Sequence, residues 1–202
     1  MEQAVTLFNG TVEISLPNGY EPVNARPNDS THPTPPPFIA ALMAELQKSF
    51  TDEDRSDMLQ SRTHELFRRG HNAYVAASLT GRDWDAAKLN ERLDGYYQGI
   101  ARSLPLVANA EIATRQANSI DEGDETTSGK SIGLIRYTFA TPRHDWFANT
   151  LLLPAGEQEA VINMACDTEQ LPARAIEFMS IADSAKLAGT ATSDVQAVDS
   201  NL

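Results

Sequence analysis

The last third of the chain carries three apolar stretches in a row, and each has the period of a β-strand. They are residues 132–140, 146–153 and 160–166, and short segments with turn residues such as Pro142 and Pro154 separate them. Side chains of a strand alternate between two faces, so each stretch can place one set on a core. Connections this short favour antiparallel hairpins, because a parallel return needs a dozen or more residues. We therefore expect an antiparallel meander.

A helical pattern follows this meander. Apolar residues recur on one helical stripe, namely Leu171, Ala175, Phe178, Met179 and Ala182. Asp167 or Thr168 is a suitable N-cap, Pro172 fits the first turn, and Gly189 ends the pattern. Such a helix is not stable alone in water, so we expect the stripe to bury against the sheet. Residues 189–202 have little to bury and are predicted to form a mobile tail.

The first two thirds of the chain add further elements. Asn9-Gly10 between two alternating stretches predicts a hairpin over residues 5–16. Residues 73–79 and 108–117 are predicted strands, and residues 84–103 a long amphipathic helix. Residues 35–70 begin with a proline run and then show helical spacing, with cations and a glycine at the end. This pattern predicts an inserted helical hairpin.

Together these elements predict an α+β fold in a single domain over residues 1–188. We expect a twisted antiparallel β-sheet with the long helix and the C-terminal helix packed on one face. The helical hairpin of residues 35–70 would be an insertion in this domain, and residues 189–202 would lie outside it. The length of 202 residues suits one domain with a sizeable core.

The net charge of the chain limits the classes of partner that we expect it to bind. The formal net charge is −12 at pH 7, and a surface this acidic repels phosphate backbones, so nucleic acid is not an expected partner. The acidity suits a basic protein partner, or serves solubility alone. No apolar run approaches the roughly 20 residues of a membrane-spanning helix, so no integral membrane segment is expected. The protein would be cytoplasmic if Met1 is native and periplasmic if a leader was removed.

Motifs that carry chemistry are not found in the sequence. It contains no phosphate loop, no G-x-S-x-G turn and no H-E-x-x-H sequence. The single cysteine, Cys166, lies on a predicted strand, so we interpret it as a buried structural thiol and not as a nucleophile. The acidic residues 121–129 lack the ligand spacing of a calcium loop. We therefore expect no enzymatic activity, no cofactor and no metal site.

One predicted turn contains residue types that are common in binding sites. Arg143, His144 and Trp146 bring a cation, an imidazole and an indole together between two predicted strands. Such a group could bind an anion or a peptide. The alternative is an ordinary hairpin turn with an aromatic anchor at the start of the next strand.

The chain resembles the DcrB-like family and its relatives of PsbP type. Residues 10–20, Gly-Thr-Val-Glu-Ile-Ser-Leu-Pro-Asn-Gly-Tyr, and residues 146–166 carry the resemblance. It implies an α+β fold and a non-enzymatic accessory role, because no catalytic residues are known for the group. Its members include bacterial envelope lipoproteins and chaperones of type VI secretion effectors. Residues 35–70 depart from the family pattern, and the lipobox cysteine of the lipoproteins is missing.

These observations predict a protein-binding accessory protein, such as a secretion-effector chaperone or an immunity-type inhibitor. The partner would be held by the helices of residues 35–70 or by the uncovered sheet face. The alternative is a small-ligand-binding protein or a small hydrolase that uses the turn around His144. The expected binding residues are Phe38, Leu42, Leu46, Arg143, His144 and Trp146.

Overall fold

The computed structural model describes residues 2–22, 65–70, 73–104, 106–119, 130–140 and 145–187. Most of the helical hairpin predicted for residues 35–70, and all of the tail predicted for residues 189–202, lie outside this part. The described part is a mixed fold of mostly antiparallel sheet with two α-helices.

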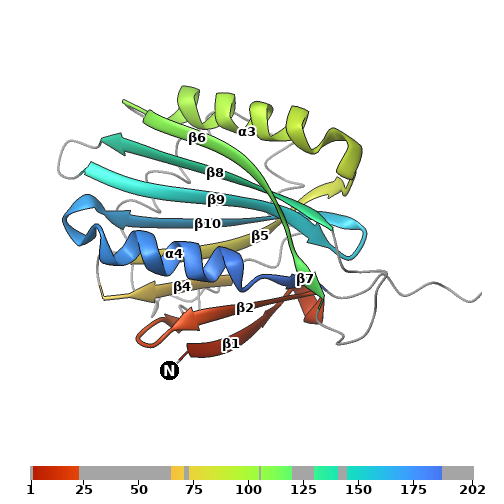
Figure 1. The fold of residues 1–202 in the computed structure, drawn as a ribbon, viewed down its shortest axis with the longest axis horizontal. Coiled ribbons are helices and arrows are strands. Elements are labelled where there is room, and N and C mark those ends of the chain that lie inside the picture. The colour runs from red at the N-terminus through yellow and green to blue at the C-terminus, as the bar shows by residue number, and fades with distance from the viewer. Residues whose placement is uncertain are drawn as a thin grey trace, which may run out of the picture.

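Seven strands form the larger sheet, and all neighbours in it are antiparallel. Figure 1 shows most of them as a stack of arrows. The spatial order is β3 (Glu21–Pro22), β4 (Glu65–Arg69), β5 (Ala73–Asp83), β10 (Gln158–Asp167), β9 (Asp145–Ala155), β8 (Ser131–Ala140) and β6 (Ala108–Gln116). The meander predicted from the last third of the chain is β8, β9 and β10, at the centre of this sheet.

A smaller sheet contains β1 (Glu2–Leu7), β2 (Val12–Pro17), β11 (Lys186–Leu187) and β7 (Asn118–Ser119) in that order. The hairpin of β1 and β2 turns through the short 3₁₀ segment Phe8–Gly10. Asn9 has φ 58° and Gly10 has φ 92°, a left-handed backbone that these two residue types tolerate. The predicted N-terminal hairpin is therefore present.

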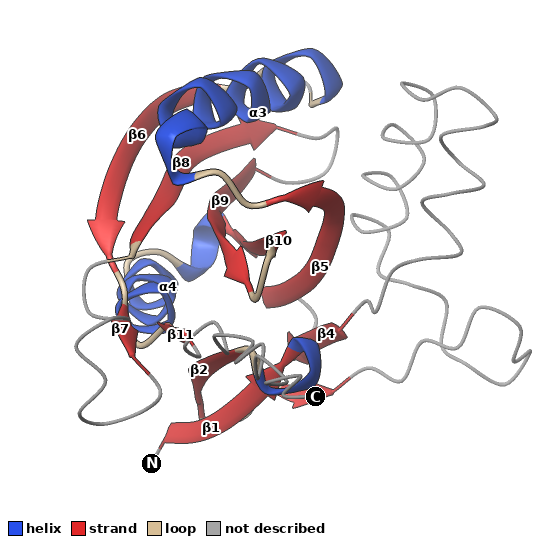
Figure 2. Cartoon of the chain, turned by 90° about the vertical axis from the view of Figure 1, so that its right-hand side faces the viewer, coloured by secondary structure: helices blue, strands red, loops and turns tan. Residues whose placement is uncertain are grey.

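Two helices pack on opposite faces of the larger sheet. Helix α3 (Leu89–Ser103) follows the 3₁₀ turn Ala86–Lys88, and α4 (Ala173–Asp183) follows the 3₁₀ turn Thr168–Gln170. Figure 2 shows α4 between the larger sheet and the smaller one, and α3 on the far side of the larger sheet. The prediction that both helices share one face is therefore wrong.

The side chains of β9, which alternate between two cores, explain why the helices lie on opposite faces. Leu151 and Leu153 belong to the core beneath α4, whereas Ala148 and Leu152 belong to the core beneath α3. A strand that is apolar on both faces needs a cover on each, because one helix can bury only one face. The α4 core is largely aliphatic and the α3 core is rich in aromatic rings.

The end of the predicted helical hairpin is also corrected. Residues 65–69, expected as the last turns of a helix, form strand β4 between β3 and β5. Phe67 pairs with Val75 and is buried with it in the α4 core. Five residues with a glycine at the end fit either structure locally, so pairing with a neighbouring strand decides between them.

The C-terminal helix buries part of the expected stripe. Phe178 and Ala182 are buried together with Ile181, and Phe178 stacks on Phe147 with ring centroids 6.2 Å apart. The helix ends at Asp183 and not at Gly189, because residues 186–187 leave it to pair with β2 and β7.

Candidate interaction site

Among the predicted binding residues, the structure describes Trp146 alone. Phe38, Leu42, Leu46, Arg143 and His144 lie outside the described residues. The Trp146 ring is buried in the α3 core, where its centroid lies 6.3 Å from Tyr74 and 6.2 Å from Phe139. Trp146 thus has the placement that we expect of an aromatic anchor at the start of a strand.

The two edges of the larger sheet are unlike each other. One edge is β3, which has two residues and includes Pro22, a residue without a backbone N–H to offer a further strand. The other edge is β6, which has nine residues and contains neither proline nor lysine. In the described part of the chain no strand pairs with the outer side of β6, and Figure 2 shows it at the margin of the sheet. A long unpaired edge of this kind can accept another strand.

Residues 106–116, which we call the β6 edge, expose apolar side chains. Leu106 is 80% exposed and Ile112 is 39% exposed. Leu106 has φ 51°, a left-handed conformation that is an outlier for a bulky side chain. An apolar residue held in water in a strained conformation is a common feature of recognition sites.

A bulge separates Leu106 from the regular part of β6. The register with β8 shifts between Ala108 and Glu111, and Asn109 has φ 53°. The Asn109 amide donates to Thr138 Oγ1 at 3.1 Å, and Thr138 Oγ1 donates to the carbonyl of Ala108 at 3.1 Å. These contacts fix the bulge, so residues 111–116 leave it as a straight strand in register with β8.

Two ion pairs lie on the β6 edge. Arg136 Nη1 donates to Glu111 Oε2 at 3.0 Å, and Arg115 pairs with Asp183 of α4. Both arginines also approach the Sδ atom of Met179 in α4, so the two pairs share the α4 face of the sheet. Glu111 remains 64% exposed, which leaves much of its carboxylate free for a partner.

A close helix contact supports β6 from the other face. Thr114 of β6 pairs with Gly133 of β8. A Cβ atom at Gly133 would lie 2.5 Å from a methyl carbon of Leu93, which is fully buried in α3. Helix α3 therefore lies directly against the backbone of β8, and glycine allows the approach.

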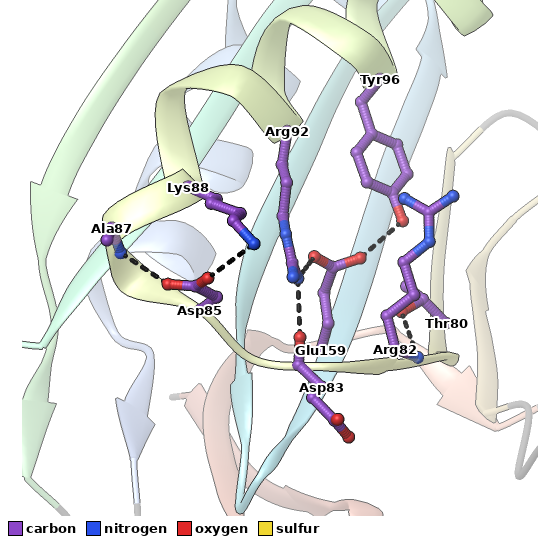
Figure 3. Close-up of polar contacts among 9 residues, drawn as sticks. All are labelled: Thr80, Arg82, Asp83, Asp85, Ala87, Lys88, Arg92, Tyr96 and Glu159. Atoms are coloured by element: carbon purple, nitrogen blue, oxygen red, sulfur yellow. Dashed lines mark hydrogen bonds and ion pairs between the residues drawn. The ribbon is translucent and has the colours of Figure 1, made fainter.

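A buried polar cluster anchors α3 at the β5–β10 side of the sheet. Glu159 of β10 is 0% exposed and pairs with Arg92 of α3. Arg92 also donates to the carbonyl of Asp83 at 2.8 Å, and the Tyr96 hydroxyl donates to Glu159 Oε1 at 3.0 Å. Figure 3 shows these side chains converging on Glu159 from α3.

The partners of Glu159 make this cluster a structural clasp. Burial raises the pKa of Tyr96, and the charge of Glu159 beside it raises that pKa further, so the phenol stays a proton donor. Both carboxylate oxygens of Glu159 have donors, as a buried charge requires. A carboxylate whose oxygens are both bonded to side chains of the fold is suited to holding a helix in place.

Cys166 is fully buried and belongs to the hydrophobic core beneath α4. Burial raises the pKa of its thiol to about 12. At neutral pH the sulfur is therefore protonated and a poor nucleophile. This placement agrees with the interpretation of Cys166 as a structural thiol.

Among the described residues, no three or more His, Cys, Asp and Glu side chains gather closely enough to hold a metal ion. No helix of this part is both long and apolar enough to span a membrane.

Sequence reasoning predicted β6 as a strand but did not recognise it as an edge. The signal was present in its composition. Residues 108–116 are mostly small and polar, and Ile112 is the only large apolar side chain among them. A central strand of this sheet, such as β9, is buried at nearly every position. A strand with so little to bury belongs at a margin.

Comparisons with known proteins complete the description. No protein-family model matches the sequence, and no curated protein matches it significantly. The structure is similar to that of the Ran-binding protein Mog1p of Saccharomyces cerevisiae, with 11% identity, a TM-score of 0.49, and coverage of 93% of this chain and 95% of that chain. It is also similar to LpqN of Mycobacterium tuberculosis, which is involved in cell envelope biogenesis, with 11% identity, a TM-score of 0.40, and coverage of 93% and 90%. Both TM-scores are below 0.5, so neither likeness supports a conclusion about function.

Proposed function

We propose that this protein is a non-enzymatic accessory protein that binds another protein chain by strand addition at the β6 edge. The observation that carries the proposal is the long, exposed strand β6, whose outer side pairs with no strand of the described residues, with Leu106 80% exposed beside it. In strand addition, backbone hydrogen bonds supply affinity, and side chains at alternate positions supply specificity.

The contrast with the β3 edge supports this proposal. Proteins protect sheet edges with short strands, prolines and charges, because an open edge pairs with other chains. The β3 edge has all three devices, namely its short length, Pro22 and Glu21, whereas the nine-residue β6 has charges at Glu111 and Arg115 and a bulge near its start. Beyond its bulge, β6 keeps a run of six residues in regular register, which is enough to pair with a partner strand.

The finer forms of the function come from the family resemblance. A secretion-effector chaperone and an immunity-type inhibitor both act by holding a protein partner, so both fit a binding edge.

Comparative capture tests the proposal. The wild-type protein, the Leu106→Asp/Ile112→Lys double variant and a control variant are used as bait in lysate of the native host, and bound proteins are identified by mass spectrometry. We expect the proteins captured by the wild type to be lost with the double variant, because both changes place charges where an apolar contact forms. The purified partner should then bind the double variant more than about tenfold more weakly.

The matched control is Ile176→Ser. Ile176 lies on α4 and is 70% exposed, so the change removes a similar exposed apolar side chain that is not part of β6. Capture should be unchanged with this variant. Equal capture by the wild type and the double variant, with unchanged melting temperatures, would overturn the proposal.

A further inference from the structure

We propose that the partner at the β6 edge is a second copy of this chain, and that two β6 strands pair antiparallel about a two-fold axis at Ala113. This inference rests on the proposed strand addition at β6. It is carried by the positions of the two charges on the strand. Glu111 and Arg115 lie two residues on either side of Ala113, and they are the charged residues of β6.

The pairing follows from symmetry. In an antiparallel pair centred on Ala113, Glu111 of one copy lies opposite Arg115 of the other, and the same contact forms again across the axis. Ile112 lies opposite Thr114 in both directions. Residues directly opposite each other share a face of the sheet. Glu111 and Arg115 already share the α4 face through their contacts with Arg136 and Asp183, so the opposed charges can meet.

The same charges disfavour the registers two residues away on either side. A pair centred on Glu111 places two carboxylates opposite each other, and a pair centred on Arg115 places two guanidinium groups opposite each other. Like charges directly opposite each other destabilise a sheet. The register centred on Ala113 is the one that places Glu111 opposite Arg115 twice, so the strand is complementary to itself in that register.

The two-fold axis runs perpendicular to the sheet, so the pair extends one continuous sheet across both copies. Because such an axis keeps the faces, both α4 helices lie on one side of the extended sheet and both α3 helices on the other. The bulge at residues 108–111 interrupts the regular strand, so the pairing about Ala113 is limited to residues 111–115.

A cysteine at the axis gives the sharpest test. Directly opposed residues of an antiparallel pair have Cα atoms about 4.5–5.5 Å apart, which a disulfide can bridge. We expect Ala113→Cys to give a disulfide-linked dimer under mild oxidation with copper phenanthroline, in which two thiols lose two protons and two electrons to the oxidant. The native Cys166 is fully buried and should give little background.

The matched control lies on the same strand. Ala110 is exposed like its neighbours, but in the proposed register Ala110 faces Gln116 of the other copy. The two Ala110 residues are then six positions apart along the strand, or about 20 Å. Ala110→Cys should therefore cross-link at least tenfold more slowly than Ala113→Cys. Equal rates for the two variants, or no cross-link with Ala113→Cys, would overturn the proposed register.

Charge reversal tests the ion pairs. Glu111→Arg places two guanidinium groups opposite each other twice, and Arg115→Glu does the same with carboxylates. Each single variant should raise the dimer dissociation constant about tenfold or more, and the double reversal should restore dimerisation, as measured by sedimentation equilibrium. A double variant as weak as the singles would contradict the contact between Glu111 and Arg115.

The mass of the wild-type protein separates this inference from the function that it rests on. A dimer has twice the mass of one 22.0 kDa chain by light scattering. If the protein is a monomer up to high micromolar concentration while Leu106→Asp/Ile112→Lys still abolishes capture of another protein, the second copy is excluded and strand addition stands. If capture is also insensitive to those changes, both proposals are overturned.

Discussion

Two of the carboxylate–arginine pairs on the larger sheet differ sharply in burial. At the β5–β10 side, Glu159 is 0% exposed and Arg92 17% exposed. At the β6 edge, Glu111 is 64% exposed and Arg136 30% exposed. The groups are the same, so the surroundings determine what each pair does.

The buried pair serves the fold. A carboxylate removed from water must keep its partners, because an unpaired buried charge is strongly destabilising. The exposed pair adds little to stability, since water and salt screen it. Its groups can exchange partners without loss of the fold, and this freedom suits an interface.

The buried pair can be broken with Arg92→Met. This change removes the cation and leaves Glu159 without its charge partner, so we expect a loss of about 3–5 kcal/mol in the free energy of unfolding. Urea denaturation followed by circular dichroism measures the loss. The double variant Arg92→Met/Glu159→Leu removes both charges and should recover most of it. A single variant within about 1 kcal/mol of the wild type would contradict the role of the clasp.

The contact between α3 and β8 can be tested with Gly133→Ala. The added methyl group would lie 2.5 Å from a Leu93 methyl carbon, and Leu93 is fully buried. We expect a destabilisation of about 1–3 kcal/mol by thermal or urea unfolding. The control is Gly99→Ala, on α3 itself, because no atom lies within 4 Å of the added Cβ. Alanine in place of glycine should stabilise the helix by up to about 1 kcal/mol. Equal effects of the two changes would show that the approach of α3 is looser than described.

The clasp also predicts a dependence on high pH. The pKa of Tyr96 is raised in the folded protein by burial and by the charge of Glu159. A raised pKa means that its contribution to stability is complete below about pH 10, the unfolded value, and is lost as pH rises above it. Between pH 10 and 11 the wild type should therefore lose up to about 1.4 kcal/mol more than Tyr96→Phe, which has no phenol to ionise. If the free energy of unfolding fell equally with pH in the wild type and in Tyr96→Phe, the proposed role of Tyr96 would be contradicted.

The exposed pair should give the smallest change in stability. We expect Glu111→Gln to alter the free energy of unfolding by less than about 1 kcal/mol, because the pair with Arg136 is solvated. The same change removes the charge that faces Arg115 of the second copy, so dimerisation should weaken. A large loss of stability without loss of association would reverse the comparison.

Periodicity predicted most of the strands and both described helices. Alternation and turn residues located the N-terminal hairpin, β5, β6 and the three central strands, because these signals are local. The helix predicted over residues 65–69 failed, since a short segment takes the structure of its neighbours and the pairing with Val75 is not local.

The side on which each helix packs and the open edge are properties of the assembled sheet. Residues 146–153 are apolar on both faces, yet both helices were predicted on one face, because nothing in the local sequence says which helix covers which face. In the same way, residues 108–116 could be read as a strand, while their position at the margin depends on what pairs with β8. The exposed Leu106 carried no periodic signal, because its conformation arises from the turn that leads into β6.

The passage from β6 into β7 has a mechanical consequence. Ala117 alone separates the two strands; it is buried, and its N–H donates to the carbonyl of Lys130 at 2.9 Å. Beyond it, β7 runs alongside β11 in the smaller sheet. Residues 108–119 thus connect the two sheets covalently. A force applied along β6 would therefore act on the hydrogen bonds between β7 and β11, the strand that follows α4. A partner bound at the β6 edge would therefore transmit force to both sheets and not to a single strand.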